Sequence, residues 1–143
     1  MVRWLIKLEA RNTREKQYRL GISDSDLCVL CEEDTESHAH LFTACKFSLK
    51  ILRELEKWLQ LQVHVPHGNY SKMQHKVCSM AWLPYCYVIW TERNNSRIEL
   101  QVKRHALVLK HLIQAIRGRI QNLLPTRVNS TDAQWLLSLD IKY

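Results

Sequence analysis

Three cysteines and one histidine lie within eighteen consecutive residues of this 143-residue chain, in the spacing C-x2-C-x8-H-x4-C. They are Cys28, Cys31, His40 and Cys45. Two thiols separated by two residues can bind one ion from a tight turn, and a histidine and a cysteine five positions apart can complete a tetrahedral ligand set. Four protein ligands leave no position for water or substrate, so the spacing predicts one structural Zn²⁺ ion.

Two other interpretations of the thiols remain open. Cys28 and Cys31 could form a redox C-x-x-C pair, although such pairs usually lie between a strand and a helix of a thioredoxin-like fold, and nothing around Cys28 indicates that context. The cysteines could also be ordinary core thiols, because free cysteine is among the most buried residue types. Clustering at metal-ligand spacing favours the zinc site over both.

A second histidine, His38, could also reach the metal. We expect His40 to be the ligand, because it stands five positions before Cys45 and the two would project on neighbouring faces if a helix begins at residues 41–46. His38 would then support the site from outside the ligand set or face solvent.

The apolar pattern predicts helices nearly throughout, because the chain has only three glycines and three prolines to interrupt them. Thr13 is a candidate N-cap for a short helix that ends before Gly21. An amphipathic helix is expected from about residue 47, with apolar positions Ile51, Leu55, Trp58 and Leu59. The residues from Pro66 to Asn69 indicate a loop.

The second half predicts further helices and a tail. Residues 71–90 are rich in bulky apolar side chains, and Pro84 should either start a new helix or kink a continuing one. A long helix is expected from Arg97 to Pro125, with an apolar stripe at Ile98, Val102, Leu109, Ile113, Ile116 and Ile120. The tail contains Trp135, which could dock back within a last short helix or pack on a partner.

Together these signals predict a mainly α fold, a small zinc-stabilised helical domain with a CCHC metal loop. We expect one domain over residues 1–143, made of a zinc-binding module (1–63), a basic helical region (70–124) and a tail (125–143). Two further cysteines, Cys78 and Cys86, are expected to be buried, as are the aromatic residues Phe42, Trp82, Tyr85, Tyr87 and Trp90. Of these aromatic residues, the four in the second half, Trp82, Tyr85, Tyr87 and Trp90, could alternatively stack on unpaired bases.

The chain carries a net charge of +7, which favours a polyanionic partner. Basic residues are concentrated in the predicted long helix, where the candidate nucleic-acid-binding residues are Arg97, Lys103, Arg104, Lys110, Arg117 and Arg119. Such a helix face could follow a phosphate backbone of RNA or DNA and release counterions without reading bases. The alternative is a solvated face that keeps the protein soluble.

No catalytic constellation is recognised. Asp24 and Asp26 form a carboxylate pair, but they lie in a short polar connection that is typical of a turn. A phosphate-binding glycine loop and a nucleophilic triad are also missing, so we expect no enzyme activity and no small-molecule substrate. No apolar run approaches the length of a membrane span, and unpaired thiols favour a reducing compartment, so an intracellular location is expected.

The cysteine and histidine run resembles a known family. The matching segments are Arg19-Leu20-Gly21-Ile22, Cys28-Val29-Leu30-Cys31, Glu36-Ser37, His40-Leu41-Phe42 and Cys45. They resemble the zinc-binding domain at the C-terminal end of reverse transcriptases of plant LINE-type (non-LTR) retrotransposons. Further similarity lies in Arg3-Trp4-Leu5, Asn12-Thr13 and Ile89-Trp90-Thr91-Glu92-Arg93-Asn94, so that about two thirds of the chain is covered.

The resemblance implies a role beside a reverse transcriptase, in which the domain holds element RNA or target DNA, and with it a nuclear location. The chain begins inside the family's usual first helical segment, so we expect a fragment or a shortened copy. Two alternatives to nucleic-acid binding are a zinc-stabilised module that presents Trp135 and apolar helix faces to another protein, and an inactive retrotransposon remnant.

Overall fold

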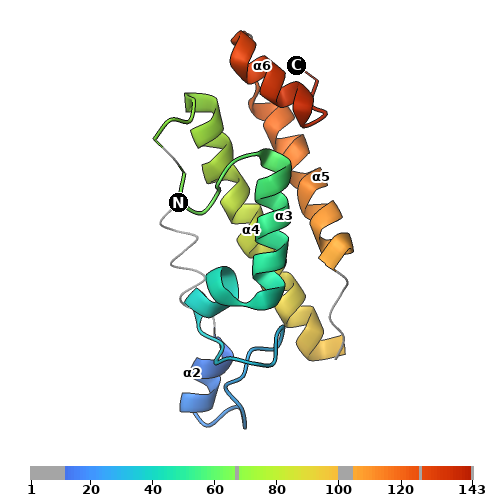
Figure 1. Ribbon diagram of the computed structural model, residues 1–143. Helices are drawn as coiled ribbons and strands as arrows, with labels where there is room; N and C mark the ends of the chain where they lie inside the picture. Colours follow the sequence, from blue (N-terminus) through green and yellow to red (C-terminus); the bar gives the residue numbers. More distant parts are fainter. Residues whose placement is uncertain (1–11, 67, 100–104, 126, 143) are drawn as a thin grey trace. The chain divides into compact units, whose positions relative to one another are not determined.

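The computed structural model describes residues 12–66, 68–99, 105–125 and 127–142, with the backbone alone described at 97–99. Its elements are α2 (Arg14–Arg19), a π-helical turn η1 (His40–Ala44), α3 (Lys46–Leu59), α4 (Lys72–Glu99), α5 (His105–Leu123) and α6 (Ser130–Ser138), as drawn in Figure 1. Within these residues an isolated antiparallel bridge, Leu27 with Thr35, is the sole strand-like pairing. The predicted mainly α fold is confirmed.

The chain divides into two compact units. Unit 1 contains Met1–Lys50 and Ile89–Lys103, and unit 2 contains Ile51–Val88 and Arg104–Tyr143. The division falls inside α3 and α4, so each of these helices contributes one end to each unit. The predicted partition into a zinc-binding module, a basic region and a tail stays a prediction.

The first described helix of unit 1 is α2, whose N-cap was predicted correctly. The Thr13 hydroxyl accepts a hydrogen bond from the Lys16 backbone N–H at 3.4 Å, which satisfies one of the donors that the first helical turn leaves free. After the helix, Gly21 adopts a φ of +71°, a left-handed conformation that glycine reaches without a steric cost. The chain then turns into residues 28–45, which we call the metal loop.

In unit 2 the helices pack through apolar stripes at helical spacing. The C-terminal part of α3 buries Ile51, Leu55 and Leu59, as predicted. Helix α6 begins at an Asn129 N-cap, whose side chain accepts from the Asp132 N–H at 2.8 Å. Trp135 is buried and its indole N–H donates to the Leu59 carbonyl at 2.8 Å. Of the two expectations for the tail, docking back as a helix is therefore confirmed.

Two helix boundaries were predicted in the second half, at Pro84 and at Arg97. Helix α4 continues through Pro84, which is buried, so of the two expectations for this proline the new helix start is excluded and the continuing helix is observed. The neighbouring side chains of Ala81, Tyr85 and Cys86 are also buried, and this packing outweighs the one backbone hydrogen bond that a proline removes. The expected helix start at Arg97 is wrong, because α4 extends to Glu99 and α5 begins at His105.

The apolar stripe of α5 is the expected one at Ile116 and Ile120 but is shifted by one position earlier in the helix. Val108, Leu112, Ile116 and Ile120 are buried, whereas Leu109 and Ile113 are half-buried. Val108 and Leu112 each precede Leu109 and Ile113 by one position, and all four are aliphatic. Periodicity alone cannot choose between them, because the choice depends on which side of the stripe meets the neighbouring helices.

Candidate metal centre

The first two cysteines of the cluster lie in a tight loop closed by backbone hydrogen bonds. The Cys28 N–H donates to the Asp34 carbonyl at 2.8 Å, and the Glu32 N–H donates to the Cys28 carbonyl at 2.8 Å. Glu32 adopts a φ of +57°, which reverses the chain direction directly after Cys31. The loop therefore directs the thiols of Cys28 and Cys31, which are three positions apart in the sequence, to the same side.

A π-helical turn positions the other two residues. In an α-helix, residues five positions apart point about 140° away from each other. In η1 the Cys45 N–H instead donates to the His40 carbonyl at 2.7 Å, five positions earlier, so that one wider turn separates the two residues. This turn brings His40 and Cys45 to the same side, and α3 begins immediately afterwards at Lys46.

The four side chains converge with the spacing of a tetrahedral metal site. Their ligand atoms all lie within 4.8 Å of one another. The Cys28 and Cys45 sulfurs are 3.8 Å apart, and the Cys31 sulfur lies 3.3 Å from His40 Nε2. A tetrahedral zinc with ordinary bond lengths places two sulfurs about 3.8 Å apart and a sulfur and a nitrogen about 3.5 Å apart. The donor set and its dimensions therefore fit zinc.

The protonation of the cluster also favours a cation. The pKa of Cys45 is lowered to about 5, because the Cys28 thiol donates a hydrogen bond to its sulfur. The same hydrogen bond, together with burial, raises the pKa of Cys28. The pair thus holds one proton between two buried sulfurs, and a metal ion would displace that proton on binding. All five cysteines are free, and no redox disulfide joins Cys28 to Cys31.

The structure places His40, and not His38, in the cluster. His40 is buried and its backbone N–H donates to the Ser37 hydroxyl at 3.0 Å. His38 is half-buried and stacks on Trp90 of α4, with ring centroids 6.4 Å apart and an angle of 20° between the planes. Its role is packing between the metal loop and α4 within unit 1, which differs from the expected solvent-facing position.

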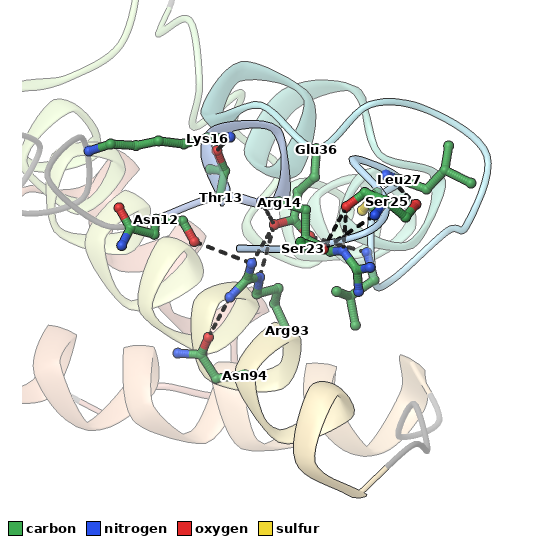
Figure 2. Close-up of polar contacts among 12 residues, drawn as sticks. Asn12, Thr13, Arg14, Lys16, Ser23, Ser25, Leu27, Glu36, Arg93 and Asn94 are labelled. Carbon is green, nitrogen blue, oxygen red and sulfur yellow. Dashed lines mark hydrogen bonds and ion pairs between the residues drawn. The ribbon is translucent and has the colours of Figure 1, made fainter. Parts of the chain in front are cut away.

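A buried ion pair that the sequence did not indicate fastens the metal loop to α4. Glu36 Oε1 accepts from Arg93 Nη2 at 2.7 Å and from Arg93 Nε at 3.0 Å (Figure 2). Glu36 is fully buried and Arg93 is 2% exposed. The arginine also donates to the Asn12 carbonyl and the Asn94 side chain, and it lies over the Trp90 ring at 4.9 Å.

The same carboxylate joins two further parts of unit 1. Glu36 Oε1 accepts from the Arg14 N–H at 2.9 Å, at the start of α2, and Glu36 Oε2 accepts from the Val29 N–H at 3.1 Å, between the first two cysteines. One side chain thus connects α2, the cysteine loop and α4. Both Glu36 and Arg93 belong to the segments that carry the family resemblance, but their pairing across 57 positions has no periodic signal in the sequence.

The predicted nucleic-acid-binding residues fall into different environments. Lys110 and Arg119 are exposed on α5. Arg117 is half-buried, lies over the Trp58 ring at 5.6 Å, and donates from Nη2 to the Leu139 carbonyl at 3.3 Å. The other three candidates lie outside the residues whose side chains the structure describes, namely Arg97, Lys103 and Arg104.

Several other residues singled out from the sequence have clear positions. Cys78 and Cys86 are buried as predicted, and desolvation raises their pKa values to about 11 and about 12. Phe42, Tyr85 and Trp90 are buried, but Trp82 is half-buried and Tyr87 is 61% exposed, so the prediction that Tyr87 is a core residue was wrong. None of the helices in the described residues has the length and apolar character that crossing a membrane requires.

Residues 1–51 match a family model described as zinc-binding in reverse transcriptase. The matched segment contains all four residues of the metal cluster and Glu36, and covers little more than a third of the chain. The predicted resemblance to a reverse-transcriptase zinc-binding domain is confirmed at this level, whereas the assignment to plant LINE-type elements stays a prediction. Neither the curated proteins nor the solved structures gave a match to the chain.

Proposed function

We propose that this chain, whose first 51 residues match a zinc-binding family of reverse transcriptases, is a zinc-binding accessory module that binds RNA or DNA without catalysing a reaction. The observation that carries the proposal is the convergence of Cys28, Cys31, His40 and Cys45 at tetrahedral spacing inside the matched segment. All four ligands come from the protein, so the site suits a structural zinc and offers no open position for a reaction.

The role of the metal would be to fix the shape of unit 1. A structural zinc bound by such a ligand set contributes on the order of 10 kcal/mol to folding, which is similar to the net stability of a whole domain. The metal would hold the cysteine loop against η1, while Glu36 fastens the same loop to α4 through Arg93. The π-helical turn and the buried ion pair therefore both stabilise the conformation of unit 1.

The charge distribution supports a nucleic-acid partner. Unit 2 contains ten lysines and arginines but four aspartates and glutamates, so it accounts for +6 of the net charge of +7. Exposed Lys110 and Arg119 are the described candidates for phosphate contacts, and Arg97, Lys103 and Arg104 extend the set. Arg117 is already engaged within unit 2 and is the weakest candidate.

The resemblance to plant LINE-type elements gives the finer part of the proposal. The partner would be element RNA or target DNA, and a reverse transcriptase polypeptide would supply the catalytic activity. Five free thiols agree with a reducing compartment, and the proposed work at target DNA implies the nucleus.

The test is binding of a fluorescently labelled 20-nucleotide single strand and of the matching duplex at several salt concentrations, measured by anisotropy on the zinc-loaded chain. We expect affinity to fall steeply between about 50 and 200 mM salt, because phosphate contacts release counterions. The double variant Lys110→Glu/Arg119→Glu should weaken binding at least tenfold. The matched control is Arg53→Glu/Lys57→Glu, which reverses two exposed charges on α3. Equal effects of the two variants, or salt-independent binding, would contradict the proposal.

A further inference from the structure

Unit 2 carries a groove, lined largely by apolar side chains, that shares no residue with the sites assigned above. Its walls are the first turns of α4, the end of α5, and the residues that precede and begin α6 (elements labelled in Figure 1). The cavity volume is about 290 Å³, close to the lower end of small ligand pockets. Its floor is formed by the side chains of Met73, Val77, Ile120, Leu123, Leu124 and Val128.

Three cations belong to the lining of this groove. Lys72 and Lys76 are one helical turn apart on α4, and Arg127 follows α5. All three are exposed, and none of them forms an ion pair with an acidic residue in the part of the chain that the structure describes. Unpaired cations beside apolar side chains attract a ligand that combines negative charge with an apolar group.

One carboxylate, Asp132, also belongs to the groove lining, but the three cations outnumber it. Asp132 is buried; its Oδ1 accepts from the Ser71 hydroxyl at 2.7 Å and its Oδ2 accepts from Asn129 Nδ2 at 2.7 Å. Asn129 Oδ1 in turn accepts the Asp132 N–H and caps α6. These hydrogen bonds stabilise the wall of the groove.

The lining distinguishes a peptide from a nucleic acid. Single-stranded binders stack bases on aromatic side chains, and none of the described residues that line this groove is aromatic. A leucine or phenylalanine side chain, by contrast, needs only an apolar cavity of this size, and flanking aspartates or glutamates would pair with the three cations.

We propose that this groove binds an acidic segment of a partner protein, with one large apolar side chain inserted between α4 and α5 and carboxylates paired with Lys72, Lys76 and Arg127. The lining contains neither the metal-centre residues nor Lys110 and Arg119, the α5 residues assigned to phosphate contacts. It therefore gives the module a protein partner in addition to its proposed nucleic-acid partner.

The test uses the full zinc-loaded chain and a fluorescein-labelled peptide, Asp-Glu-Glu-Leu-Phe-Glu-Asp-Glu, followed by anisotropy. A second peptide has serine in place of leucine and phenylalanine. We expect the triple variant Lys72→Glu/Lys76→Glu/Arg127→Glu and the floor variant Leu123→Asp each to weaken binding of the first peptide at least tenfold. The matched control is Arg53→Glu/Lys57→Glu/Lys142→Glu, which changes the net charge equally at exposed positions of unit 2 and should retain binding.

Three outcomes would overturn the proposal. Equal binding of both peptides would show attraction by net charge without an apolar anchor. Equal losses of peptide affinity in the triple groove variant and in its control would also show attraction by net charge alone. Direct binding of the labelled single strand that is lost in Lys72→Glu/Lys76→Glu/Arg127→Glu but kept in Lys110→Glu/Arg119→Glu would show that the groove is a nucleic-acid site. Circular dichroism of Leu123→Asp confirms folding, which is expected because Leu123 is already 39% exposed.

Discussion

Arg93 and Glu36 form an ion pair in the interior of unit 1, in which Nε and Nη2 of the arginine both donate to Glu36 Oε1, with the shorter distance at 2.7 Å. A buried charge without its partner carries an unfavourable desolvation free energy, so such pairs are sensitive to the removal of one member. Here the glutamate also accepts the backbone N–H groups of Arg14 and Val29. The pair thus connects the cysteine loop to two helices through one carboxylate.

Loss of either member of this pair should destabilise the folded chain strongly. We expect Arg93→Ala and Glu36→Gln each to lower the free energy of unfolding by about 3–5 kcal/mol. Chemical denaturation of the zinc-loaded protein measures this change. The control is Lys46→Ala, which removes the exposed pair between Lys46 and Glu33 and should leave stability unchanged. Similar stabilities of Arg93→Ala and Lys46→Ala would contradict a structural role for the buried pair.

The metal centre should bind one zinc ion per chain. Elemental analysis of the purified protein is expected to give one equivalent of zinc, and Cys31→Ser and His40→Ala should lose it, together with part of the helical circular-dichroism signal. His38→Ala is the matched control, because this histidine stacks on Trp90 and lies outside the cluster. Retention of zinc by His40→Ala and its loss from His38→Ala would reverse the ligand assignment.

Thiol reactivity should separate the five cysteines into two groups. Burial raises the pKa values of Cys78 and Cys86 to about 11 and about 12, so at pH 8 these thiols are protonated as well as shielded. Iodoacetamide should modify none of the five in the zinc-loaded chain. Chelation is expected to unfold the metal loop, so that Cys28, Cys31 and Cys45 become exposed and are modified, while Cys78 and Cys86 react only in denaturant. Peptide mass spectrometry reads the pattern, and early modification of Cys78 would contradict its position in the core.

Arg117 should contribute to stability and not to phosphate binding. Its guanidinium contacts the Trp58 ring and the Leu139 carbonyl, so we expect Arg117→Ala to lower the free energy of unfolding by about 1–2 kcal/mol. Arg119→Ala, two positions away at an exposed site, should change stability little and weaken nucleic-acid binding instead. Thermal unfolding measures the stability of both variants, and anisotropy measures their nucleic-acid binding. Equal stability of the two variants would contradict the structural role of Arg117.

Short-range signals in the sequence were sufficient for much of this protein. The spacing from Cys28 to Cys45 selected the four residues that the structure brings together, and Thr13, Gly21 and the α3 stripe indicated local structure correctly. Such features depend on neighbours within a few positions, where backbone geometry fixes which side chains can meet. The π-helical turn between His40 and Cys45 was missed, because its five-residue spacing also fits an ordinary helix start.

Tertiary structure decided what long-range packing controls. The sequence by itself determined a mainly helical chain with a compact cysteine and histidine cluster and an excess of positive charge. Only the fold pairs Glu36 with Arg93 across 57 positions. It also places Arg117 over the Trp58 ring. The same applies to the groove, whose lining contains Lys72, Lys76 and Arg127. The physical reason is that distant side chains become neighbours through helix packing, and the linear pattern of one helix carries no record of which face another helix will cover.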